Sequence, residues 1–153
     1  MTPKRAPGKR RPATAVAESR VEYAARRILL DTHTWLWWYD ADRRLGARAR
    51  ALIAGADEVR FSAVSAWEIV IKQAIGKLVI RGVFDLAREL DRDGFLTVPI
   101  TIAHTEEVRH LPSVHRDPFD RLLVAQARVE GLTILTGDDA ISRYDVPVID
   151  ARG

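Results

Sequence analysis

The stretch RILLDTHTWLW, residues 27–37, determines the fold that we expect for this chain. Its apolar run Ile28–Leu30 ends at Asp31, a pattern typical of a short strand buried inside a sheet. The segment Thr34–Tyr39 follows at once and carries three tryptophans, and we interpret it as a helical turn. A strand that leads directly into a helix is the unit from which parallel sheets are built.

The rest of the chain repeats this alternation. The pattern predicts four further strands, at Val59–Ser62, Phe95–Pro99, Leu132–Leu135 and Val146–Ile149. It predicts six helices, at Ala47–Ala54, Ser65–Ile75, Phe84–Leu90, Ile102–His110, Pro118–Glu130 and Asp139–Tyr144. Parallel strands joined by helical crossovers form a three-layer α/β/α protein, with helices on both faces of a central parallel sheet.

Composition excludes several classes of protein. The 153 residues are 47% apolar and 29% charged, which is enough apolar content for one domain with a core and too much for a wholly disordered chain. The absence of cysteine excludes a disulfide framework, a thiolate zinc site and a cysteine nucleophile. No apolar run is long enough to cross a membrane, and we expect a cytoplasmic protein.

The net charge of +3 is unevenly distributed. Residues 1–27 carry a net charge of +6, so the remainder carries −3. We interpret residues 1–26 as a basic, disordered extension and residues 27–153 as the domain. Two alternatives for the extension stay open, an arm that binds phosphates non-specifically and a start codon assigned too far upstream.

Carboxylates concentrate where the predicted strands end or the following helices begin. They are Asp31, Glu68, Asp117, Asp120, Asp138 and Asp139. The carboxyl ends of parallel strands meet at one edge of the sheet, so these groups can converge there. Clustered carboxylates repel one another and their pKa values rise unless a cation neutralises them. Oxygen ligands suit Mg²⁺ or Mn²⁺, and such a site suits phosphodiester chemistry.

Each carboxylate also has a purely structural explanation. Ser65 and Glu68 match a capping box at the start of a helix. Glu68 also stands four residues before Lys72, the spacing of a helical ion pair. Asp31 and Asp117 are both suited to cap a helix N-terminus. Periodicity alone leaves the structural and the functional explanations open.

Four segments resemble, in order and with family-like spacing, the motifs of PIN-domain proteins of the VapC toxin type. They are residues 27–37, SAVSAWEIVIK at 62–72 with Gly76–Leu78 after it, HRDPFDRLLVAQA at 115–127, and LTGD at 135–138 with Tyr144, Val146 and Val148–Ile149. The likeness runs from about residue 27 to residue 150 and leaves the basic extension out.

This resemblance implies an endoribonuclease that depends on Mg²⁺ or Mn²⁺ and hydrolyses RNA phosphodiester bonds with a metal-activated water. It implies that the protein is the toxin of a type II toxin–antitoxin pair, with a VapB-type antitoxin and a second copy of itself as partners. The residues implied to be catalytic and to hold the metal are Asp31, Glu68, Asp120 and Asp138. Possible accessory groups are Asp117, Asp139 and the Thr136 hydroxyl, which would orient the metal ligands.

Other residues give weaker indications. His115 and Arg116 are candidates for RNA phosphate contacts. The tryptophans can stack on unpaired bases, although core packing is the commoner role. The Trp35–Tyr39 region is also a candidate groove for the antitoxin. His104 we expect on a helix surface.

Two other functions remain possible at this level. A phosphohydrolase of the haloacid dehalogenase type also places an aspartate after its first strand, but it normally has Asp-x-Asp, and this chain has His33 at the second position. The other possibility is a PIN-like module that binds RNA or a partner without catalysis.

Overall fold

The computed structural model describes residues 26–82 and 84–153. The extension predicted at residues 1–26 therefore lies almost entirely outside the described residues. Within the described ranges, no helix combines the length and the apolarity needed to cross a bilayer.

The sheet is five-stranded and all its strands are parallel, which confirms the predicted fold class. Its strands are β1 (Arg27–Leu30), β2 (Glu58–Ser62), β3 (Leu96–Val98), β4 (Thr133–Thr136) and β5 (Val148–Asp150). Their order is β3-β2-β1-β4-β5, so the first strand occupies the centre. Leu30 at the end of β1 pairs with Phe61 of β2 and with Leu135 of β4.

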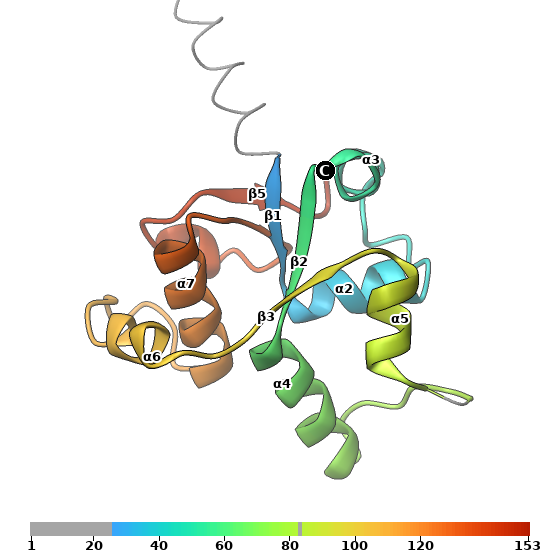
Figure 1. Cartoon of the computed structure of the whole chain (residues 1–153), viewed down its shortest axis with the longest axis horizontal. Helices are drawn as coiled ribbons and strands as arrows, with labels where there is room; N and C mark the ends of the chain where they lie inside the picture. The colour runs from blue at the N-terminus through green and yellow to red at the C-terminus, as the bar shows by residue number, and fades with distance from the viewer. Residues whose placement is uncertain (1–25, 83) are drawn as a thin grey trace, which may run out of the picture.

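Helices cover both faces of this sheet (Figure 1). They are α2 (Thr32–Tyr39), α3 (Ala47–Gly55), α4 (Ala63–Ala74), α5 (Leu86–Arg92), α6 (Ile102–Val108) and α7 (Pro118–Glu130). The helices α2, α3 and α5 lie on one side, and α6 and α7 lie on the other. The predicted helix at 139–144 is wrong, because that segment contains only the 3₁₀ turn η1 (Ile141–Arg143).

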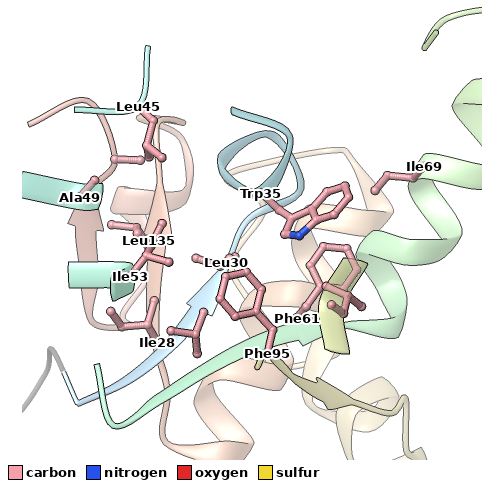
Figure 2. Packing of buried hydrophobic residues seen from close by; sticks show 13 residues of the cluster. Ile28, Leu30, Trp35, Leu45, Ala49, Ile53, Phe61, Ile69, Phe95 and Leu135 are labelled. Atoms are coloured by element: carbon pink, nitrogen blue, oxygen red, sulfur yellow. The ribbon is translucent and has the colours of Figure 1, made fainter. Parts of the chain in front are cut away.

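Side chains of β1 alternate between the two faces and so contribute to two hydrophobic clusters. Ile28 and Leu30 join the cluster under α2 and α3, where Trp35 packs against Phe61 with ring centroids 5.2 Å apart (Figure 2). Leu29 points to the opposite cluster, beneath α7. Trp35 is 1% exposed, so core packing is its role and no face of its ring is open to an RNA base.

The parallel sheet brings the ends of β1, β2 and β4 to a common edge. Asp31 follows β1 directly, and its backbone N–H donates to the carbonyl of Leu135 in β4 at 3.1 Å. The helix α4 continues straight from β2, and its N-cap is Ser62, whose hydroxyl accepts the N–H of Val64. The structure therefore excludes the capping-box alternative for Ser65 and Glu68, because both residues lie inside α4.

Candidate active site

Asp31 lies at the bottom of a group of carboxylates on this sheet edge. Its side chain is buried, and its Oδ2 accepts a hydrogen bond of 2.9 Å from the Thr136 hydroxyl. The same Thr136 oxygen accepts the backbone N–H of Asp138 at 2.9 Å. One hydroxyl at the end of β4 thus fixes both Asp31 and the loop that carries Asp138.

Glu68 reaches the same edge from α4 and is also buried. The Thr32 hydroxyl donates to its Oε2 at 2.6 Å, and the Ser65 hydroxyl lies 2.9 Å from Thr32. The Lys72 ammonium donates to Oε1, which confirms the ion pair suggested by the four-residue spacing. Both carboxylate oxygens of Glu68 are held by partners on α2 and α4.

The roles of Thr32 and Ser65 were not anticipated from the sequence. Both helices begin two residues earlier than the sequence pattern predicted, and the correct starting residues would have pointed to these roles. With α2 beginning at Thr32 and α4 beginning at Ala63, Thr32 lies in the first turn of α2, and Ser65 and Glu68 lie one turn apart on a shared helix face.

Asp120, in the first turn of α7, meets Asp138 through the imidazole of His115. The Nε2 of His115 lies 3.1 Å from Asp120 Oδ2 and 3.2 Å from Asp138 Oδ2. Its Nδ1 lies 3.0 Å from the backbone N–H of Asp117 and must accept from it. The proton of the neutral ring is therefore on Nε2, where it is shared between the two carboxylates. Hence His115 points inward, and its proposed contact with RNA phosphate stays a prediction.

The remaining candidates lie around this cluster. Asp117 caps α7, since its Oδ1 accepts the N–H of Phe119 at 2.8 Å. Asp139 is exposed and pairs with Arg152 at 2.6 Å, so the structure does not bring it into the group. Arg116 is exposed beside the cluster. Among the described residues, His115, Asp120 and Asp138 offer ligand atoms that lie within 4.8 Å of one another, and Asp31 and Glu68 lie near enough to repel Asp120. We call the four side chains Asp31, Glu68, Asp120 and Asp138 the acidic centre.

The electrostatics of the acidic centre are those of a site with too much negative charge. Burial, followed by repulsion from Asp31, Asp117, Glu68 and Asp138, raises the pKa of Asp120 to about 8. Burial also raises the pKa of Asp31, against the hydrogen bond from Thr136. A hard divalent cation would offset this repulsion, and carboxylate oxygens are its preferred donors. The donor set therefore fits Mg²⁺ or Mn²⁺.

Without metal, the acidic centre should make the protein less stable as pH rises. Folded Asp120 keeps its proton up to about pH 8, whereas the unfolded chain loses it near the ordinary value of 3.8. Between these values the folded state binds more protons, so the free energy of unfolding falls with rising pH, by up to about 1.4 kcal/mol per pH unit.

Denaturant unfolding in chelator across this pH range measures the effect. The Asp120→Asn variant is the matched control, because it lacks the titrating group and its curve should be flatter than that of the wild type. Parallel curves for the two proteins would contradict the assigned electrostatics.

Comparisons with known proteins agree with this architecture. The PIN domain family model matches residues 28–147. Ribonuclease VapC22 of Mycobacterium tuberculosis is 32% identical over 123 residues, which cover 78% of this chain and 93% of that protein.

Two solved structures have the same fold at low sequence identity. One is the crystal structure of VapBC2 from Rickettsia felis bound to a promoter DNA fragment, with a TM-score of 0.58, 14% identity, and coverage of 80% of this chain and 96% of the matched chain. The other is a toxin–antitoxin complex from Klebsiella pneumoniae, with a TM-score of 0.56, 16% identity, and coverage of 81% and 97%.

Proposed function

Because this chain belongs to the PIN-domain family and is VapC-like within it, we propose that it is the toxin of a type II toxin–antitoxin pair and cleaves RNA with Mg²⁺ or Mn²⁺. The observation that carries the proposal is the burial of Asp120 among other carboxylates, those of Asp31, Asp117, Glu68 and Asp138, which together raise the pKa of Asp120 to about 8. Repelling carboxylates held together in a partly buried group are stabilised at neutral pH by protons or by a cation.

The four carboxylates of the acidic centre would hold the cation. When bound, it would polarise the phosphoryl oxygen and acidify a water molecule. Around it, Thr136 holds Asp31 and Thr32 holds Glu68, so both carboxylates keep their direction before a ligand arrives. The Nε2–H of His115 draws Asp120 and Asp138 toward a common point.

We propose three partners for the protein. Single-stranded RNA is the substrate, and a VapB-type antitoxin is the inhibitor, in line with the toxin–antitoxin complexes among the structural neighbours. A homodimer is the third expectation, and it stays a prediction. The haloacid dehalogenase alternative is wrong, because the chain belongs to a different family.

The proposal is tested by incubating the protein with cellular RNA in Mg²⁺, in Mn²⁺ and in chelator, and by sequencing the new ends. We expect cleavage only with metal, which leaves 5′-phosphate and 3′-hydroxyl ends. The mapped ends also give the preferred cleavage sequence. Intact RNA under all conditions would contradict the proposal and favour a module that binds without cutting.

A further inference from the structure

A hollow of about 460 Å³ opens between α2 and α4, next to the acidic centre. Its floor is apolar and includes the side chains of Leu36, Trp37 and Leu78. Basic side chains at its rim come from three segments and are Arg44, Lys72 and Lys77. We call this feature the Trp37 hollow.

The Trp37 hollow is continuous with the acidic centre through two contacts. A methyl group added at Gly137 would lie 2.6 Å from Cη2 of Trp37, so the indole edge rests on the backbone between Thr136 and Asp138. On the other side, the rim residue Lys72 donates to Glu68. The Trp37 hollow therefore borders the acidic centre on two sides, and a chain bound at the centre can extend into it.

The charges of the hollow are opposite to those of the acidic centre. Three cations line it together with a single carboxylate, Asp40. Lys72 and Arg44 are held by Glu68 and Asp42, whereas Lys77 is exposed and makes no ion pair among the described residues. Since residues 28–153 carry a net negative charge, an approaching polyanion needs such a local basic rim.

Trp37 also offers the chemistry that an unpaired base requires. It is half-buried, and the guanidinium of Arg44 lies over its ring at 5.3 Å from the centroid. Indole rings and guanidinium planes are the surfaces on which single-stranded bases stack, and nearby lysines bind the backbone phosphates. An apolar protein segment would use the floor of the hollow but would gain little from the basic rim.

We propose that the Trp37 hollow binds the nucleotide next to the scissile phosphate of single-stranded RNA, with its base against Trp37 and Arg44 and its phosphate at Lys77. The proposal rests on the proposed RNA cleavage and adds a substrate subsite to it. It assigns to Trp37 and Lys77 a role in binding RNA, separate from the reaction at the acidic centre.

The test compares steady-state cleavage by Lys77→Ala, Trp37→Leu and Trp37→Phe, on a short single-stranded RNA taken from the mapped cleavage site. Lys77→Ala should raise KM about tenfold with kcat unchanged, and should lower the slope of log affinity against log salt by about 0.7. Trp37→Leu should also raise KM about tenfold, and Trp37→Phe, which keeps a ring for stacking, should recover most of it.

Arg109→Ala is the matched control, because it also removes one exposed cation, from the end of α6. Its KM and salt slope should stay near those of the wild type. A wild-type KM and salt slope for Lys77→Ala would overturn the subsite while leaving RNA cleavage established. Unchanged KM combined with weaker inhibition by co-expressed antitoxin would also overturn it, by assigning the hollow to a protein partner. Absence of cleavage by the wild type would instead count against the proposed function.

Discussion

Replacing Asp31 by asparagine is expected to lower the rate of RNA cleavage about a thousandfold. Asparagine has the same shape, and its side-chain oxygen can still accept the hydrogen bond from Thr136. The change removes one negative charge from the buried centre that would hold the cation. Metal-assisted catalysis is worth several kcal/mol, and each 1.4 kcal/mol lost lowers the rate about tenfold.

Single-turnover cleavage of the mapped RNA measures this effect. Asp57→Asn is the matched control, because Asp57 is exposed and precedes the amino end of β2, at the opposite edge of the sheet. We expect Asp57→Asn to cleave at the wild-type rate. Undiminished cleavage by Asp31→Asn would remove Asp31 from the catalytic site.

Asp120→Asn is expected to stabilise the metal-free protein while it abolishes stabilisation by metal. The substitution removes the carboxylate whose pKa is raised to about 8, and with it the repulsion from its neighbours. Above about pH 8, the free energy of unfolding of Asp120→Asn in chelator should therefore exceed that of the wild type by about 1 to 3 kcal/mol. Wild-type protein should instead gain about 2.7 kcal/mol from metal at a hundred times its Kd, and the variant should gain almost nothing.

Thermal unfolding with chelator and with Mn²⁺ gives both quantities for both proteins. Relative to the wild type, the variant should be more stable in chelator and less stabilised by Mn²⁺. This pattern separates the explanation from simple misfolding, since a damaged fold would be less stable under every condition. If Asp120→Asn were destabilised in chelator, the proposed repulsion at Asp120 would be refuted.

For some elements, local sequence signals predicted the exact first and last residues. The helix α7 has the predicted bounds, Pro118–Glu130, because its terminal signals agree. Asp117 caps the N-terminus, Pro118 fits the first turn, and Gly131 ends the helix with a φ of 63°, a left-handed conformation that favours glycine.

Other parts depended on contacts that no local pattern reveals. Ser62 and Ser65 are both suited to cap a helix, and only the end of β2 decides that Ser62 does so. His104 is 1% exposed, so its predicted place on a helix surface is wrong. Its Nε2 lies 2.8 Å from Glu130 in α7, a pairing across 26 residues that makes its burial possible.

In the candidate site too, local patterns predicted some features, whereas others depend on contacts between distant parts of the chain. Alternation of strands and helices placed the carboxylates at one sheet edge, which is a consequence of parallel topology. His115 points toward the centre because the Asp117 backbone N–H donates to its Nδ1. Asp139 points away from the centre because it pairs with Arg152. Such contacts decide which of several adjacent carboxylates face the centre.

Isothermal titration of Mn²⁺ into the metal-free protein tests the central claim most directly, because it detects a cation at the acidic centre without reference to any RNA. We predict saturable binding to the wild type and none to Asp31→Asn. Binding should release protons, seen as a heat that depends on the ionisation enthalpy of the buffer, since Asp120 must lose its proton. Absence of binding to the wild type, or equal binding to Asp31→Asn, would contradict the account.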